Sequence, residues 1–306
     1  MIEPGWDMVP EKGLLAPPVG SNHGSSSPLS DLRDIGTDLV RFRELLFELT
    51  LRDIRIRYKQ AVMGFLWAIL TPLVVVLSGW ILRIAFGHLY GEAPNDVVMA
   101  GVAVKSLGWA FFVGALAFGT ASITANLTLV TKTYFPREIL PLASVLTQLV
   151  DAAIGVAALA VALPFFGVHL SLGLLWVFPL ILALVMITTG AVLLGSCANV
   201  FFRDAKHVVQ LVLSFGIFFT PVFFNADAFG SFGSGLIMLN PLAPVLEGLR
   251  LAIVQQHDLL RPLLTDQGHL VWTPWYLVYG GAWAVGLLTI SAIIFHRAEF
   301  VFAEYV

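Results

Sequence analysis

The chain has 306 residues, of which 58% are hydrophobic and only 12% charged. Soluble domains contain about 45–50% apolar and about 25% charged residues, and the mean hydropathy of +0.86 points the same way. This composition predicts an integral membrane protein and excludes a soluble enzyme or a secreted disulfide scaffold. The net charge of -3 offers no basic surface for nucleic acid, and a single cysteine, Cys197, cannot form an internal disulfide.

The chain begins with two segments that are not apolar enough to cross a membrane. Residues 1–37 contain a Pro-Pro pair and a Ser-Ser-Ser-Pro run, which is typical of a flexible tail, here expected in the cytosol. In residues 38–60, apolar side chains recur at helical spacing while arginines and carboxylates fill the other faces. This pattern predicts an amphipathic helix in the headgroup plane, and a soluble helix packed on a partner is the alternative.

Residues 61–306 are expected to form a six-helix transmembrane domain. A crossing needs about 20 mostly apolar residues, and the segments that qualify are roughly 62–86, 99–125, 144–167, 173–200, 207–225 and 273–295. An even number of crossings puts both termini on one side, and thirteen of the 17 lysines and arginines fall on that side. Because basic residues favour the cytosolic side, both termini are predicted to be cytosolic.

The longest external loop, residues 226–272, has an apolar stretch of its own. That stretch is interrupted by Asn240-Pro241 and by Pro244, so it predicts short helices rather than a crossing. Two interpretations stay open, namely re-entrant helices that dip into the membrane and a plain folded loop. The predicted fold class is an all-α integral membrane protein, with six transmembrane helices preceded by an amphipathic interfacial helix and short external re-entrant helices between spans five and six.

Chemical motifs are sparse in this chain. It has no Walker phosphate loop, no zinc-protease motif and no serine-hydrolase motif, so we expect no catalytic residue, metal or cofactor on it. Asp151 is the one charged residue that lies clearly within an expected span. We expect its carboxylate to accept hydrogen bonds from neighbouring hydroxyls and backbone groups, and the alternative is that it carries protons. Lys105 and Arg83 lie near external span ends, where a long side chain can extend to the interface.

A series of motifs then resembles one known family. The motifs are Arg52-Asp53-Ile54-Arg55-Ile56-Arg57-Tyr58-Lys59 with Gly64-Phe65-Leu66-Trp67, Trp109 with Phe111-Phe112, Lys132-Thr133-Tyr134-Phe135-Pro136-Arg137-Glu138-Ile139-Leu140, Asn199-Val200 with Arg203-Asp204, and Asn240-Pro241 with Glu247 and Arg250. Their order over about residues 38–306 is similar to that in the polysaccharide-export permeases of ABC transporters. These are the type-2 exporter membrane subunits that export O-antigen, capsule and teichoic-acid chains.

The resemblance implies a function and partners. It implies a homodimer in the bacterial plasma (inner) membrane, bound to two cytosolic ATP-binding-cassette subunits that hydrolyse ATP, so this chain is not itself an enzyme. The cargo would be a lipid-linked polysaccharide that passes through a channel between the two copies. The segment at about 132–142 would be a coupling helix that contacts the ATPase, through Lys132, Thr133, Tyr134, Phe135, Pro136, Arg137, Glu138, Ile139 and Leu140. A simple capped loop is the alternative.

Two groups of side chains are candidates for contact with such a cargo. The cations near the predicted headgroup level suit the pyrophosphate of a lipid carrier, or else follow the positive-inside rule and bind anionic lipid; they are Arg52, Arg55, Arg57 and Lys59. The aromatic rings suit the apolar faces of sugars, or else pack between helices and face lipid; they are Trp67, Trp109, Phe111, Phe112, Phe215, Phe218, Phe219 and Phe223.

Three other hypotheses compete with this one. The first is an ABC permease for a drug or a small lipid. The second is an integral-membrane glycosyl- or phosphotransferase, which needs acidic clusters for metal, although the cytosolic loops between spans offer only Glu138 and Asp204. The third is a membrane scaffold without a passage.

Overall fold

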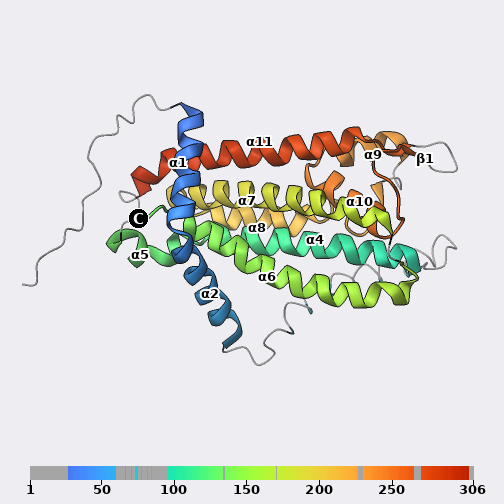
Figure 1. Ribbon diagram of the computed structural model, residues 1–306, viewed down its shortest axis with the longest axis horizontal. Helices are drawn as coiled ribbons and strands as arrows, with labels where there is room; N and C mark the ends of the chain where they lie inside the picture. Colours follow the sequence, from blue (N-terminus) through green and yellow to red (C-terminus); the bar gives the residue numbers. More distant parts are fainter. Residues whose placement is uncertain are drawn as a thin grey trace, which may run out of the picture.

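The computed structural model is an elongated bundle in which the long helices run side by side (Figure 1). It describes residues 27–59, 96–133, 135–169, 171–226, 230–264 and 270–302, and a few positions between 66 and 84. Most of the first expected span, 62–86, and most of the expected tail therefore lie outside the described residues. We call the two ends of the bundle the α1 end, where α1, α5 and the end of α11 lie, and the α10 end, where α9, α10 and the strands lie (Figure 1).

Two consecutive helices cross the α1 end. Helix α1 covers Pro28–Arg41, and the Ser27 side chain caps it by accepting a hydrogen bond from the Ser30 backbone N–H at 3.3 Å. The chain turns at Phe42 and continues as α2, Arg43–Lys59, which packs against α6. Helical structure thus begins at Pro28, before the boundary at residue 38 that the apolar spacing indicated, because the cap and the proline at the first turn set the start.

Four helices in the described part of the chain are long and apolar enough to cross a membrane. They are α4 (Asp96–Thr120), α6 (Ile139–Ala162, continued by η2, Leu163–Phe166), α7 (Val177–Phe201, preceded by η3, Leu172–Trp176) and α11 (Trp275–Ala298, continued by η5, Glu299–Val301). They correspond to the second, third, fourth and sixth expected spans. The predicted multi-pass helical membrane fold is therefore confirmed, and the count of six crossings stays a prediction.

The region of the fifth expected span, 207–225, is shorter in the structure than the sequence suggested. Helix α8 covers Ala205–Gly216, and the chain then follows turns as far as Pro221. Glycine and proline are the two weakest helix formers. A β-carbon at Gly216 would also lie 2.9 Å from the ring of Trp109 on α4, so the helix ends where it meets that indole.

The segment between α8 and α11 forms the short helices that its prolines predicted. Helix α9 covers Gly230–Met238 and α10 covers Leu242–Ile253, with a bend of 108° between them. Asn240 stabilises the bend, because its side-chain oxygen accepts from the Leu242 N–H at 3.1 Å and its amide donates to Thr220 at 2.9 Å. Pro244 does not break α10, since it lies in the first turn, where a missing N–H removes no helical bond.

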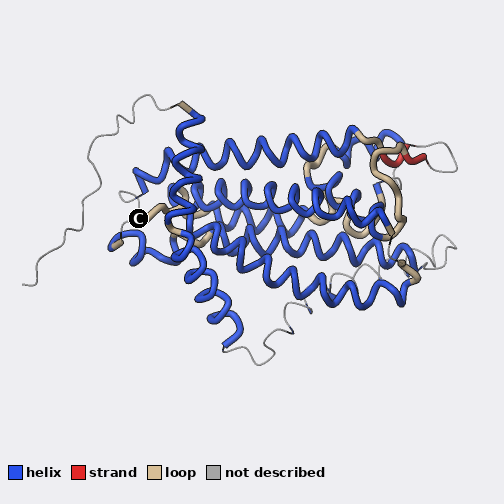
Figure 2. Tube along the Cα trace, viewed as in Figure 1, coloured by secondary structure: helices blue, strands red, loops and turns tan. Residues whose placement is uncertain are grey.

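A small antiparallel pair of strands completes the α10 end, as Figure 2 shows. Strand β1 covers Leu263–Leu264 and β2 covers Leu270–Trp272. The sequence did not predict these strands. The buried Trp272 ring donates its indole N–H to the Leu259 carbonyl at 2.9 Å, so the pair closes over the end of the core.

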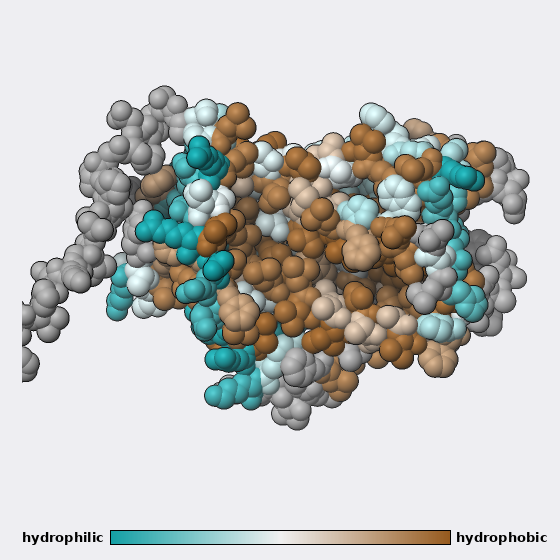
Figure 3. All heavy atoms as spheres, in the orientation of Figure 1, coloured by the Kyte–Doolittle hydropathy of each residue, from teal (hydrophilic) through white to brown (hydrophobic). Residues whose placement is uncertain are grey.

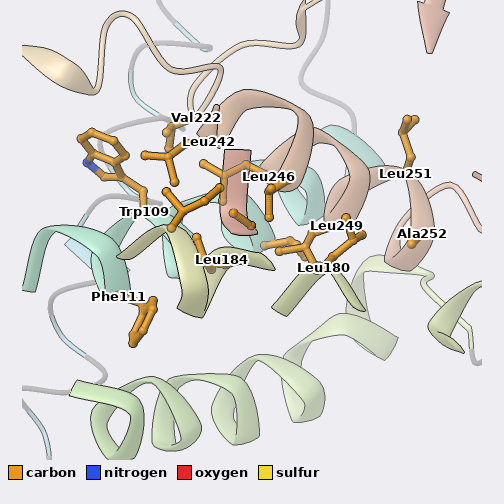
Figure 4. Close-up of a cluster of buried hydrophobic side chains, with 14 of the residues drawn as sticks. Trp109, Phe111, Leu180, Leu184, Val222, Leu242, Leu246, Leu249, Leu251 and Ala252 are labelled. Carbon is orange, nitrogen blue, oxygen red and sulfur yellow. The ribbon is translucent and has the colours of Figure 1, made fainter. Parts of the chain in front are cut away.

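Helix α7 is the centre of the bundle and packs against α4, α10 and α11. A β-carbon at Gly190 would lie 3.0 Å from the α11 backbone at Leu287 and Leu288, so the two helices touch closely there. The main core gathers leucines of α7 and α10 around Trp109 and Phe111 of α4 (Figure 4). On the outside, apolar residues form a broad belt between two polar ends, as expected of a surface that faces lipid tails (Figure 3).

Candidate functional site

Three of the four cations predicted at the headgroup level line one cavity at the α1 end. Arg52, Arg55 and Lys59 of α2 border a space of about 660 Å³, whose other walls are Glu48, Leu49, Ile56 and Leu129. The Arg52 guanidinium also pairs with the neighbouring Asp53 at 2.8 Å. Within the described residues, Arg55 and Lys59 have no ion pair and are exposed. These two cations can therefore meet an anion that enters the cavity.

The fourth cation, Arg57, has a different environment. Its guanidinium donates to the carboxylate of Asp151 and, at 3.1 Å, to the side-chain oxygen of Gln148, both on α6. It also lies 4.4 Å above the centre of the Phe118 ring of α4. Arg57 does not line the cavity bordered by Arg52, Arg55 and Lys59, which we call the basic cavity, and instead attaches α2 to the bundle.

Both carboxylate oxygens of Asp151 accept hydrogen bonds, so this residue has a structural role. Besides Arg57, it accepts a hydrogen bond from the Tyr58 hydroxyl. Burial raises the pKa of Tyr58 above its ordinary value, and the hydrogen bond to Asp151 adds to this, so the phenol stays a neutral donor. The hydroxyl partner was expected, and the arginine partner was not.

The predicted coupling segment, 132–142, is not a helix of its own in the structure. Helix α5, Leu127–Lys132, follows the short turn η1, Thr124–Asn126, and ends where the segment begins. Residues 133 and 135–138 are loop and turn, Tyr134 lies outside the described residues, and α6 starts at Ile139. Pro136 explains this, because proline lacks an N–H and disfavours helical geometry in the residue before it.

The apolar residues of this segment face the chain's own core. Phe135 is buried and Ile139 and Leu140 are almost fully buried, in a second core with Leu49 and Phe295. Within the single chain they therefore present almost no exposed apolar surface, and the role in ATPase contact that the resemblance gave to Phe135, Ile139 and Leu140 stays a prediction. The exposed side chains here are Leu127, Thr128 and Thr131 of α5, followed by Lys132 and Thr133.

The two charged residues of the segment contact the end of α11. The Arg137 backbone N–H donates to Glu299 Oε2 at 3.2 Å, and the Arg137 guanidinium donates to the Glu299 carbonyl. Glu138 Oε1 lies 3.0 Å from His296 Nδ1. Nearby on α1, burial raises the pKa of Asp38, and the negative charge of Glu138 adds to the shift.

The predicted channel aromatics fall into two groups. Trp109 and Phe111 are buried in the main core (Figure 4), and Phe112 is half-buried with its ring 5.7 Å from that of Trp109. Phe223 is also half-buried, and Trp67 lies outside the described residues. By contrast, the rings on α8 and just after it are 57–74% exposed, namely Phe215, Phe218 and Phe219. Among the predicted aromatics that the structure describes, only this second group offers a largely exposed aromatic surface.

A group of buried charges lies at the α10 end, where the sequence analysis expected a lysine that extends to the interface. Lys105 of α4 is fully buried, and its ammonium lies 3.3 Å from Glu247 Oε2 and 2.7 Å from the Phe224 carbonyl. Arg250, on the same helix as Glu247, donates to the other oxygen of that carboxylate at 2.5 Å. Lys105 is therefore an internal anchor that holds α10 against α4, and the expectation that it reaches the interface is wrong.

Sequence reasoning missed both charged groups as units. One signal for each group was visible in the sequence, namely two charged or titratable residues spaced three apart, which places them on one face of a helix. The two pairs are Glu247 with Arg250 and His296 with Glu299. What a sequence does not indicate is the partner from a distant helix, Lys105 in the first case and Glu138 in the second.

The comparisons with known proteins agree with this architecture. The family described as ABC-2 type transporter matches residues 44–254, from α2 to the end of α10. Two O-antigen export system permease proteins RfbA from Klebsiella pneumoniae are each 28% identical over 204 residues, which is 66% of this chain and 77% of each relative. A permease protein of the same name from Myxococcus xanthus is 28% identical over 229 residues, which is 72% of this chain and 84% of the relative.

The family match extends over more than half of the chain and includes the headgroup-level cations, the α5–α6 segment and the α9–α10 bend. It confirms the transporter family that the motifs predicted. The chain therefore belongs to the ABC-2 type transporter family and is a multi-pass membrane protein.

Proposed function

We propose that this chain is the membrane subunit of an ATP-driven exporter that moves a lipid-linked polysaccharide out of the cytosol. The observation that carries the proposal is the similarity to O-antigen export permeases over about two thirds of the chain or more. Family membership supports the export of a cargo by a subunit that relies on a separate cassette ATPase. In this proposal the α1 end faces the cytosol, in agreement with the excess of lysine and arginine predicted there.

The basic cavity would receive the pyrophosphate of the lipid carrier. Arg55 and Lys59 are exposed cations without an ion pair within the described residues, and the cavity also has the apolar walls Leu49, Ile56 and Leu129, on which a lipid chain would rest. Arginine presents a planar fork of donors that matches phosphate oxygens. Arg57 has no part in this role, because its guanidinium is engaged by Asp151.

The exposed aromatic residues of α8 and of the turns just after it would line the passage between two copies of the chain. Phe215, Phe218 and Phe219 are exposed in the monomer, and Phe202, Val208 and Leu211 continue this apolar surface. Flat rings contact the C–H faces of sugars without selecting one linkage, which suits a polymer. The buried Trp109 and Phe111 would instead support the wall from behind.

Helix α5 and Thr133, which follows it, would meet the ATPase. Several of their side chains are exposed, whereas Phe135, Ile139 and Leu140 hold the segment in the chain's own core. The contact would therefore use Leu127, Thr131, Lys132 and Thr133. The charged residues Arg137 and Glu138 would transmit the movement to α11, since Glu138 contacts His296 in its last turn and Arg137 contacts Glu299 of η5, which continues it.

The test is export in cells that lack the gene for this chain. We expect the lipid-linked polysaccharide to accumulate inside, and the intact gene to restore it at the cell surface. A double substitution Arg55→Gln/Lys59→Gln should lower surface polysaccharide at least about tenfold, since two charge-assisted contacts to phosphate are lost. The matched control is Arg33→Gln, an exposed cation of α1 outside the cavity. Normal surface polysaccharide in the deletion strain contradicts the proposal.

A small-lipid permease is the second candidate, and one feature favours it. A cavity of about 540 Å³ between α4, α6 and α7 has almost purely apolar walls, including Leu107, Phe111, Leu149 and Leu184. Such a cavity can hold an acyl chain. If the deletion changes the lipid composition of the outer leaflet and leaves surface polysaccharide unchanged, this second function is the correct one.

A further inference from the structure

Three side chains that commonly bind metals converge at the α1 end. The ligand atoms of Glu138, His296 and Glu299 all lie within 4.8 Å of one another. His296 Nδ1 is 3.0 Å from Glu138 Oε1 and 3.6 Å from Glu299 Oε1. A tetrahedral ion with bonds of about 2.1 Å holds its ligand atoms about 3.4 Å apart. We propose that these three residues bind a divalent transition-metal cation, with Zn²⁺ as the best match.

One carboxylate oxygen of this group lacks a hydrogen-bond partner. Glu138 is only 3% exposed, and its Oε2 atom is buried with no hydrogen-bond partner among the residues that the structure describes. A buried carboxylate oxygen left without a donor is unfavourable by about 1–3 kcal/mol or more. A metal ion coordinated by both oxygens of Glu138 would satisfy this atom.

The carboxyl groups of Glu138 and Glu299 also lack a basic side chain to balance their charge. In the described part of the chain, neither Glu138 nor Glu299 has a lysine or arginine side chain within ion-pair distance of its carboxylate. The Arg137 guanidinium donates to the Glu299 carbonyl, and the nearby Arg297 pairs with Asp31 at 2.8 Å. Two carboxyl groups therefore share one imidazole and repel each other when both are ionised. A divalent cation would offset this repulsion.

Neighbouring groups hold the side chains of Glu299 and His296 in place. The Arg137 backbone N–H fixes Glu299 through Oε2 at 3.2 Å and leaves Oε1 directed at the histidine. The His296 ring packs edge-on against Phe300, with centroids 6.0 Å apart. Metal sites depend on such outer contacts to orient their ligands. Here they come from the α5–α6 loop and from the last turns of α11.

One imidazole and two carboxylates favour zinc over magnesium or calcium, which prefer oxygen ligands alone. Such a site departs from the expectation of a metal-free chain that the sequence supported. A bound ion would join the start of α6 to the end of α11. The inference does not depend on the proposed export function, because it concerns the isolated chain.

The test measures Zn²⁺ binding to the full-length chain in detergent, after removal of any affinity tag and treatment with a chelator. We expect one high-affinity Zn²⁺ per chain by titration calorimetry. Glu138→Gln and His296→Gln should each weaken it at least about 100-fold, since outer contacts alone are worth 10–100-fold. The matched control is His207→Gln, an exposed histidine at the start of α8, which should leave binding unchanged.

A second measurement needs no variant. The X-ray absorption spectrum of the Zn²⁺-loaded wild-type chain should show oxygen and nitrogen ligands with one imidazole and no sulfur. The proposal is overturned if Zn²⁺ does not bind, if the variants bind it as tightly as the wild type, or if the spectrum shows sulfur or several imidazoles. Folding of each variant is checked by its elution volume and circular dichroism.

Discussion

The two ends of the bundle each contain a buried group of charges, and the two groups are balanced in opposite ways. At the α10 end, Lys105 and Arg250 enclose a single carboxylate, Glu247, and all three are almost fully buried. At the α1 end, two carboxylates share His296, and one carboxylate oxygen has no partner within the described residues.

The difference teaches what each end can do. The group at the α10 end leaves no carboxylate oxygen unpaired, because both oxygens of Glu247 are used and the lysine also donates to the Phe224 carbonyl and to Asn225. Such a group fixes α10 against α4 permanently. The group at the α1 end is incomplete without a cation or a proton, so its strength can change with what it binds. That end also contains the segment that we propose contacts the ATPase.

The largest expected effect comes from breaking the group at the α10 end. Glu247→Gln leaves two buried cations without their counter-charge, and removal of one partner of a buried ion pair lowers the free energy of unfolding by about 3–5 kcal/mol. We expect a large drop in melting temperature and in folded yield in detergent. The control is Arg261→Gln, from an ion pair whose arginine side chain is 81% exposed, which should change stability by less than about 1 kcal/mol. A wild-type melting temperature for Glu247→Gln would show that the group is not structural.

An intermediate loss of stability is expected from breaking the ion pair of Arg57 and Asp151, in which one cation meets one carboxylate. Asp151→Asn removes the charge that holds Arg57 and Tyr58, and hydrogen bonds to charged groups contribute about 1.5–3 kcal/mol each. We expect destabilisation of about 3 kcal/mol, measured by thermal unfolding. Tyr58→Phe should lose about 1.5 kcal/mol, since it removes only one of these bonds. Equal losses in the two variants would mean that the arginine contributes nothing.

The smallest effect is expected from Glu138→Gln in the metal-free chain. The substitution removes one of two carboxylates that repel each other, so the loss of its bond to His296 is offset. We expect a change in the free energy of unfolding within about 1 kcal/mol, measured beside Glu247→Gln under the same conditions. A loss as large as that of Glu247→Gln would show that the charges at the two ends are balanced in the same way.

The sequence predicted the apolar helices best and the helix boundaries less well. The second, third, fourth and sixth expected spans match helices, because long apolar runs are a strong signal. The segment 132–142 was expected to be helical, but Pro136 divides it into a loop and the first turn of α6. The start of α1 at Pro28 was missed because residues 1–37 were treated as one flexible tail, although Leu29, Leu32 and Ile35 recur there at helical spacing.

The candidate site was only partly predictable for the same kind of reason. The basic residues of α2 were identified as a set, yet helical rotation separates Arg57 from the cavity that Arg52, Arg55 and Lys59 line. The aromatic set likewise divides into buried Trp109 and Phe111 and exposed Phe215, Phe218 and Phe219. Residue type predicted the chemistry, and the direction of each side chain needed the structure.

By itself, the sequence determined that this chain is a helical membrane protein of the transporter family that its motifs resemble. Hydropathy and local motifs suffice for this, because transfer into a bilayer depends on the residues of each segment alone. Only the tertiary structure decided which charges meet. Lys105 and Glu247, or Glu138 and His296, are more than 140 residues apart. Their pairing depends on how separate helices pack, and no local pattern encodes that packing.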